Sequence, residues 1–198
     1  MEKKEDRRTK MTKDFLKHGL TELMKKKSIN DISVKELCDL SDVNRSTFYK
    51  HYATITELYE DMINDIAENI LYISRLAREG GYIFKAKYVE AILNYVENNR
   101  DLFLVILSVN GNIGFGEFMV NSTDKVIGDF QIPDFYKYCL YFVVSGMSSI
   151  IWKWLNEEKR MPAHSLAILI SSLMYHGIDR AGKFALNAFD SKDGTEKT

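Results

Sequence analysis

The sequence predicts an all-α protein in which a three-helix N-terminal head is joined to a larger helical domain. Proline, the strongest helix breaker, occurs only at Pro133 and Pro162 in 198 residues. Apolar residues recur at spacings of three and four over long stretches, as they do along one face of a helix. Two segments also carry the Ser/Thr-x-x-Glu pattern that caps the start of a helix. Together these features favour helices throughout the chain.

A first helix is predicted over residues 9–26. Its apolar stripe consists of Phe15, Leu16, Leu20, Leu23 and Met24, which have the spacing of a core-facing side. Lys25, Lys26 and Lys27 follow at its end, where basic side chains complement the helix dipole. We therefore expect this helix to pack on the short helices that follow and to hold them at a fixed angle.

A second helix is predicted to begin at Val34, because Ser33 and Glu36 have capping-box spacing. Its apolar face is formed by Val34, Leu37, Cys38 and Leu40. The pattern breaks at Ser41 and Asp42, and Val43 is expected to fill the corner before the next helix. The segment therefore predicts a short helix that ends in a tight turn.

A third helix is predicted over residues 45–51, with Asn44 capping it through its side-chain oxygen. Phe48 and Tyr52 lie four residues apart and are expected to face inward. The small core of the head is then completed by Leu37, Leu40, Val43, Phe48 and Tyr52. Thr54 and Glu57 form a second capping box, which opens the helix that follows.

The outward side chains of this third helix are basic, hydroxylated and aromatic, a set that suits the major groove of DNA. The predicted DNA-contacting residues are Arg45, Ser46, Thr47, Tyr49, Lys50 and His51, with Lys35 from the preceding helix. The alternative is an ordinary helical corner, because helix-turn-helix hairpins also occur in proteins that never meet DNA.

Residues 31–58, DISVKELCDLSDVNRSTFYKHYATITEL, resemble the DNA-binding region of the TetR family of bacterial transcriptional regulators. The likeness rests on the run STFYKHY at residues 46–52 and on Glu57 and Leu58 opening the next helix. Two positions depart from the family pattern: Asp42 stands where the turn usually has glycine, and Ile55 lies near a usual lysine. The resemblance implies a DNA-binding regulator, most often a repressor, that a small-molecule effector releases from a palindromic operator.

The distribution of charge agrees with this reading. Residues 1–53 carry 13 Lys and Arg against 9 Asp and Glu, and residues 54–198 carry 14 against 19. A head of charge +4 therefore adjoins a body of charge −5, within a chain of net charge −1. Such asymmetry is typical of a protein whose basic part meets nucleic acid.

The larger domain is predicted over residues 54–189, after a head of residues 1–53 and before a disordered tail of residues 190–198. Its helices are expected at residues 54–78, 84–98, 100–109, 115–127, 133–156 and 162–187. Glycines mark the breaks between the middle helices, and the two prolines begin the last two.

The last two predicted helices are apolar on nearly every side. A helix of this kind must be buried on more than one face, and a two-fold interface between identical subunits accounts for it. The predicted dimerisation residues are Tyr141, Val144, Met147, Ile151, Leu169 and Leu173. Two helices from each subunit would form a four-helix bundle, so that two DNA-reading helices lie about 34–36 Å apart, one turn of DNA.

Aromatic residues are concentrated after the head and suggest a cavity for an apolar or aromatic effector. The predicted lining residues are Tyr88, Tyr95, Phe103, Phe115, Phe118, Trp152 and His176. The alternative is ordinary core packing, which is the commoner role of a buried aromatic ring.

Several other classes of protein are excluded by the sequence. No apolar run reaches the ~18 residues of a membrane span, and the N-terminus is not that of a signal peptide. Cys38 and Cys139 have no partner at metal-ligand spacing, and buried free thiols fit a reducing cytoplasm. We expect no cofactor and no metal.

No catalytic constellation is evident either, since the histidines His18, His51, His164 and His176 do not cluster. A non-enzymatic alternative is a helical protein-interaction co-regulator without its own small-molecule ligand. The outward Arg45, Thr47, Tyr49 and Lys50 favour the DNA-binding reading over this alternative, because an adaptor has no use for them.

Overall fold

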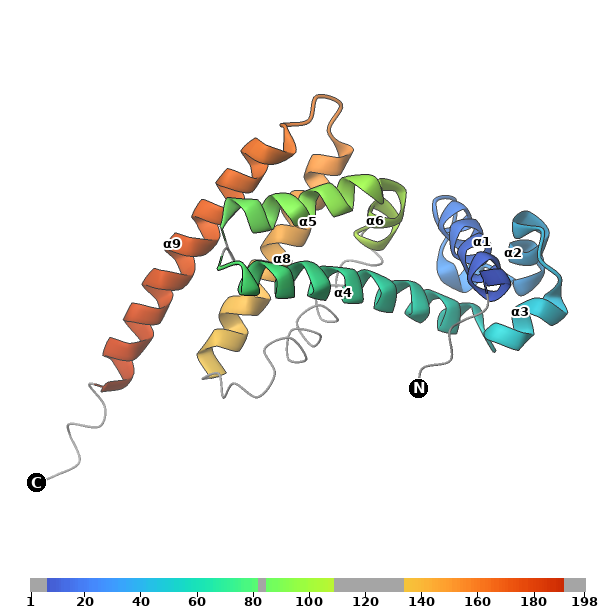
Figure 1. Ribbon diagram of the computed structural model, residues 1–198, viewed down its shortest axis with the longest axis horizontal. Helices are drawn as coiled ribbons and strands as arrows, with labels where there is room; N and C mark the ends of the chain where they lie inside the picture. The colour runs from blue at the N-terminus through green and yellow to red at the C-terminus, as the bar shows by residue number, and fades with distance from the viewer. Residues whose placement is uncertain (1–6, 82–84, 109–133, 191–198) are drawn as a thin grey trace, which may run out of the picture. The chain divides into compact units, whose positions relative to one another are not determined.

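The computed structural model describes residues 7–81, 85–108 and 134–190, and within these ranges all side chains except those of residues 134–137, 140 and 178–190. Every regular element in this part of the chain is a helix, which confirms the predicted all-α class (Figure 1). The elements are α1 (Arg7–Met24), a short 3₁₀ helix η1 (Ile29–Asp31), α2 (Val34–Ser41), α3 (Arg45–His51), α4 (Ile55–Glu79), α5 (Ala86–Asn98), α6 (Arg100–Ile106), α8 (Asp134–Asn156) and α9 (Ala163–Asp190). The helix predicted over residues 115–127 and the tail predicted after residue 190 lie outside the described residues.

The chain forms two compact units, which divide between Glu68 and Asn69, within α4. The boundary predicted after residue 53 comes earlier than this division. The difference arises because the first half of α4 belongs to the first unit, where it buries Leu58, Met62 and Ile66. A sequence pattern marks where α4 begins, but not how far along it the packing of the first unit extends.

In the first unit, α1 buries Leu16, Leu20 and Leu23, as the apolar stripe predicted. Phe15 was expected on the same stripe but is 55% exposed. The reason is angular, because a residue one position before Leu16 is turned by about 100° around the helix axis. Met24 lies half-buried at the last turn.

The α2 helix begins as predicted, with the backbone N–H of Glu36 donating to Ser33 Oγ at 3.2 Å. The Glu36 carboxylate pairs with the ammonium of Lys27 at 2.5 Å, and Lys27 also donates to the carbonyl of Asp31. Lys27 therefore ties the end of η1 to α2. The helix ends at Asp42, which has a left-handed backbone with φ 52° and ψ 41°.

Two expectations for this region are wrong. Leu40 was placed in the small core but is exposed, because it points away from the side of α2 that carries the buried Leu37 and Cys38. Asn44 occupies the capping position of α3, but its side chain makes no capping hydrogen bond. Its carbonyl oxygen accepts instead from the backbone N–H groups of Thr47 and Phe48, at 2.9 and 3.0 Å.

The α3 helix spans the predicted residues and is anchored by two aromatic rings. Phe48 is fully buried and Tyr52 is 3% exposed, which confirms that both face inward. The second capping box also forms. The N–H of Glu57 donates to Thr54 Oγ1 at 3.1 Å, and the Glu57 carboxylate accepts from the N–H of Ala53 at 2.6 Å.

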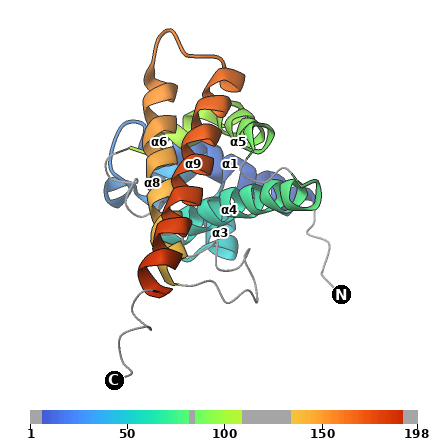
Figure 2. The same ribbon diagram turned by 90° about the vertical axis from the view of Figure 1, so that its left-hand side faces the viewer.

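In the second unit, α5 packs against α9, while α8 packs on both α6 and α9 (Figures 1 and 2). Polar contacts fix the ends of these helices. Arg100 donates to the carbonyl of Leu155 at 2.8 Å, and the Trp154 indole donates to the carbonyl of Met161 at 2.7 Å. The Arg160–Glu97 ion pair and a 3.1 Å contact between His164 Nδ1 and the Glu90 carboxylate join the region before and at the start of α9 to α5.

A buried polar pair links α4 and α5 inside the second unit. Ser74 Oγ donates to the carbonyl of Ile70 at 2.8 Å, so the phenol of Tyr88 donates to Ser74 Oγ across 3.0 Å. Burial raises the pKa of the Tyr88 phenol, although its bond to Ser74 acts in the opposite direction. Tyr88 therefore stays protonated and holds α5 against the second half of α4.

Candidate nucleic-acid interface and apolar groove

The outer face of α3 carries four exposed side chains that lie next to one another. Arg45 and Tyr49 are four residues apart, as are Ser46 and Lys50, so the two pairs form adjacent rows on one side of the helix. All four are exposed, and Tyr49 is 59% exposed. Of the other predicted contact residues, Thr47 and His51 are half-buried, and Lys35 is exposed on α2.

The ring of Tyr49 packs against the buried ring of Phe48. Its centroid lies 5.4 Å from that of Phe48, with the two planes at 85° in an edge-to-face arrangement. Phe48 in turn lies 5.9 Å from Tyr52. The exposed phenol of Tyr49 therefore projects from a ring that packs on the buried aromatic residues.

The electrostatic surroundings of α3 are mixed. Arg45 lies close enough to Cys38 to affect its thiol, yet burial is the larger influence and the pKa of Cys38 is raised. The thiol therefore stays neutral and acts as a small apolar side chain. Asp39 and Asp42 are exposed beside the turn, so acidic side chains adjoin the basic outer face of α3.

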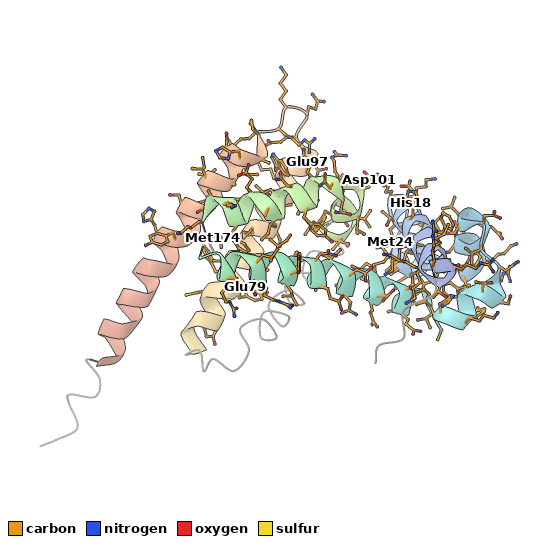
Figure 3. The ribbon with its side chains drawn as sticks, viewed as in Figure 1. His18, Met24, Glu79, Glu97, Asp101 and Met174 are labelled. Atoms are coloured by element: carbon orange, nitrogen blue, oxygen red, sulfur yellow. The ribbon has the colours of Figure 1, made fainter. Side chains whose placement is uncertain are left out.

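An apolar groove of about 590 Å³ lies between α8 and α9 in the second unit. Its described walls are almost entirely hydrocarbon and are formed by Tyr138, Cys139, Phe142, Val143, Gly146, Met147, Ile150, Ile170, Leu173, Met174 and Gly177. Met174, labelled on α9 in Figure 3, is one of the buried members of this wall. The groove has no charged residue in this lining, so its chemistry suits an uncharged apolar occupant.

None of the predicted effector-cavity residues within the described part of the chain borders this groove. Tyr88 and Phe103 are buried in the packing of α5 and α6, and Tyr95 is half-buried with its ring edge-on to Phe103. Trp152 and His176 are exposed, while Phe115 and Phe118 lie outside the described residues. The number of aromatic residues in the sequence could not distinguish rings that pack in the core from rings that line a cavity. The missed signal was the pair of small residues, Gly146 and Gly177, within two apolar helices.

The predicted dimerisation residues divide into two groups. Tyr141, Leu169 and Leu173 are exposed, and Val144 and Met147 are half-buried, so these five remain available to a partner. Ile151 is only 6% exposed and belongs to the core of the protomer itself. The exposed apolar face is extended by residues not named from the sequence: Tyr138, Phe142, Trp152, Ile168 and Tyr175.

The described residues contain neither a candidate metal site nor a candidate membrane span. No group of three or more His, Cys, Asp or Glu side chains there could hold a metal ion. Cys38 and Cys139 are both free thiols. None of the helices in those residues is long and apolar enough to cross a membrane.

Comparison with known protein families gives a match over residues 86–176 to the TetR-type transcriptional regulator C-terminal region. The chain is also 25% identical over 179 residues to the uncharacterised HTH-type transcriptional regulator YxbF of Bacillus subtilis (strain 168). That alignment covers 90% of this chain, which spans only 42% of the length of the relative.

Solved structures share the fold. A TetR transcriptional regulator from Streptococcus agalactiae 2603V has a TM-score of 0.59 and 21% identity, covering 85% of this chain and 96% of its own. A tetR-family regulator from Streptomyces coelicolor has a TM-score of 0.59 and 13% identity, covering 88% and 83%. The dihydroxyacetone kinase operon activator DhaS has a TM-score of 0.54 and 21% identity, covering 85% and 96%.

Proposed function

Because the chain belongs to the TetR family of transcriptional regulators, we propose that it is a sequence-specific DNA-binding regulator that reads its operator with α3. One observation carries the proposal: four neighbouring side chains, Arg45, Ser46, Tyr49 and Lys50, project from a short helix whose inner face is fixed by Phe48. A buried anchor and a free polar face are what a helix needs to enter a major groove with a defined orientation.

The four side chains have separable roles in this proposal. Arg45 and Lys50 supply the positive charge that attracts phosphate and displaces counterions. The Ser46 hydroxyl and the Tyr49 phenol supply hydrogen bonds to phosphates or base edges. Thr47 and His51, at the half-buried margins of the helix, and Lys35 on α2 contribute at the periphery.

The regulator is proposed to act in the cytoplasm as a homodimer on a palindromic operator. Tyr141, Leu169 and Leu173 are exposed on α8 and α9, beside further large apolar side chains on both helices. Large exposed apolar side chains gathered on two neighbouring helices mark a site of interaction with another protein. A two-fold pairing through α8 and α9 would cover it and present two copies of α3 to the DNA.

The groove between α8 and α9 supports an uncharged apolar effector, which would release the DNA if it binds more tightly to a conformation unable to bind the operator. Repression with release by effector is the form of regulation that we propose. The structurally similar DhaS is named an operon activator, so the direction of regulation needs its own test.

The proposal is tested by selecting duplexes from a random-sequence DNA pool with the full-length protein. We expect enrichment of an inverted repeat, with affinity that falls as salt concentration rises. Recovery of unrelated sequences after repeated rounds, with no repeat and no salt dependence, would contradict DNA reading and favour the co-regulator alternative. A reporter gene behind the selected duplex then distinguishes repression from activation.

A further inference from the structure

A charged hydrogen-bond network joins three helices of the first unit next to the end of α3. The phenol of Tyr52 donates to Asp61 Oδ2 at 2.6 Å. The ammonium of Lys17 lies 2.8 Å from the same oxygen and donates to Asp65 Oδ2 at 2.5 Å. One carboxylate oxygen of Asp61 therefore receives a proton donor from α1 and another from the residue that ends α3.

The members of this network are partly shielded from water. Tyr52 is 3% exposed, and the side chains of Lys17 and Asp61 are 17% and 32% exposed. Hydrogen bonds to an ionised partner are shorter and stronger than neutral ones, and partial burial strengthens them further. The ammonium of Lys13 adds to this positive environment at 5.8 Å from the centre of the Tyr52 ring.

The position of Tyr52 in the chain connects the hydrogen-bond network directly to the end of α3. Tyr52 directly follows the last helical residue, His51, and its backbone N–H donates to the carbonyl of Phe48 at 2.9 Å. The same residue thus closes the last turn of α3 and bonds to α4 through its side chain. Tyr49 and Lys50 lie only three and two positions earlier.

Apolar contacts alone define this geometry loosely, because the hydrophobic effect has no direction. In the first unit the close backbone approaches join α1 to α2 and α2 to α3. The attachment of α4 depends more on long side chains, and the Lys17–Asp61–Tyr52 network supplies directional bonds there. If one bond of this network were lost, the core would remain folded, but α3 could tilt more freely relative to α4.

We propose that Asp61 is a positioning residue for DNA reading, which holds α3 through Tyr52 and Lys17 at the angle that base recognition requires. The inference rests on the proposed function, and Asp61 itself does not contact DNA. The consequence is specific: the network affects recognition of the correct sequence more than attraction to phosphates. Contacts to base edges depend on the helix angle, whereas general attraction to the DNA backbone tolerates a small tilt.

The leading test variant is Tyr52→Phe, which removes one oxygen, keeps the buried ring and leaves the net charge unchanged. Affinity is measured with the full-length protein for the selected inverted repeat and for a random-sequence duplex of equal length. We expect Tyr52→Phe to weaken binding to the selected duplex about tenfold, equal to about 1.4 kcal/mol, with much less effect on the random duplex. Tyr59→Phe, which removes a half-buried phenol oxygen elsewhere on α4, is the matched control and should bind both duplexes normally.

Further variants separate positioning from simple stabilisation. Lys17→Arg retains a donor to Asp61 and should keep the preference for the selected duplex, whereas Lys17→Met should lose it. Combining Tyr52→Phe with Asp61→Asn should cost less than the sum of the two single changes, since both interrupt the same contact. Circular dichroism at the assay temperature verifies that each variant is folded.

Equal weakening of both duplexes by Tyr52→Phe, unchanged binding to both, or a matching loss in Tyr59→Phe would each overturn the inference. If Tyr49→Ala abolishes selective binding while Tyr52→Phe has no effect, the positioning role fails and the proposed function stands. If the wild-type protein selects no sequence at all, the proposed function and this inference fail together.

Discussion

A methyl group placed on Gly19 would lie 2.1 Å from the hydroxyl oxygen of Ser41 and 3.2 Å from a methyl carbon of Leu37. Glycine thus lets α1 and α2 approach closely, at a helical position where it would otherwise be unfavourable. The Ser41 hydroxyl is buried, and among the described residues it has no hydrogen-bond partner. At this contact, the lack of a side chain on Gly19 allows the two helices to approach, and the Ser41 hydroxyl opposite it makes no hydrogen bond among the described residues.

Gly19→Ala should destabilise the first unit by about 1–3 kcal/mol, because the added methyl group overpacks the contact between α1 and α2. Ser41→Ala should be nearly neutral, since it removes an unpaired buried oxygen. The double variant should recover much of the loss. Hydrogen exchange of peptides from the first unit, measured across a urea series, reports these differences. A Gly19→Ala protein as stable as the wild type would disprove the close approach.

Tyr49→Ala and Lys50→Ala should weaken binding to the selected duplex while leaving helix content and subunit association unchanged, because both side chains are exposed. Phe48→Ala should act in the opposite way and destabilise the first unit by about 3–5 kcal/mol through loss of a fully buried ring. Anisotropy titrations and urea unfolding measure the two effects. Normal DNA affinity in Tyr49→Ala would remove that residue from the proposed interface.

Asp42→Gly should stabilise the first unit by about 0.5–1 kcal/mol, because glycine adopts the left-handed backbone of this turn without steric cost. Asp39→Gly is the matched control. It lies inside α2, where glycine is a poor helix former, so it should lower the stability instead. Thermal unfolding of both variants provides the comparison. A destabilising effect of Asp42→Gly would mean that the aspartate side chain itself stabilises the turn.

The stability of the first unit should fall with acid through Asp61. Burial alone would raise the pKa of its carboxyl, but hydrogen bonds from Lys17 and Tyr52 and the nearby positive charges overcome this and leave it lowered from 3.8. A carboxylate of this kind stabilises the fold above its unfolded-state pKa of about 3.9 and loses that effect as pH falls through the lower folded value. The Asp61→Asn variant would lack this contribution at every pH.

The stability gap between wild type and Asp61→Asn should therefore be constant above about pH 5 and close progressively below pH 4. The pH dependence that Lys17 contributes has the opposite sign. Burial acts to lower its pKa, but hydrogen bonds to Asp61 and Asp65 outweigh this and leave it raised above 10.5. Its contribution is present below that pH and is lost as the pH rises through the folded value. Urea midpoints between pH 3 and 8 test the acid limb, and a gap that does not change with pH would contradict it.

Leu173→Lys should shift the protein toward monomers, because a charge placed on the exposed apolar face of α9 would have to be buried in the proposed interface. Asn94→Lys, on the exposed side of α5, is the control and should associate as the wild type does. Sedimentation velocity over a dilution series measures the shift. Unchanged association in Leu173→Lys would move the interface away from this part of α9.

The sequence predicted the first unit well because its signals are local. A capping serine or threonine, a left-handed aspartate and a buried aromatic pair each act within a few residues, so the start of α2 and the span of α3 followed directly from them. The errors concern relations between helices. Leu40 and Phe15 have the right residue type and nearly the right spacing, but only the neighbouring helices decide which side is covered.

The second unit was less predictable for the same reason. The α8 and α9 helices were found from their prolines and apolar runs, to within three residues at each end. Their groove depends on how two such helices diverge, and no local pattern encodes that divergence. The Tyr52–Asp61 bond was also missed. It joins residues nine apart across the end of a helix, and phenol and carboxylate have many other partners available in a sequence.

Large apolar side chains on α8 and α9 stand exposed on the single protomer, and these helices follow the first unit along the chain. During synthesis from the N-terminus, the early helices can fold before the later ones leave the ribosome. The exposed apolar surface of α8 and α9 is thus synthesised after the helices of the first unit. The proposed pairing of two subunits through α8 and α9 therefore follows the folding of the first unit and does not have to precede it.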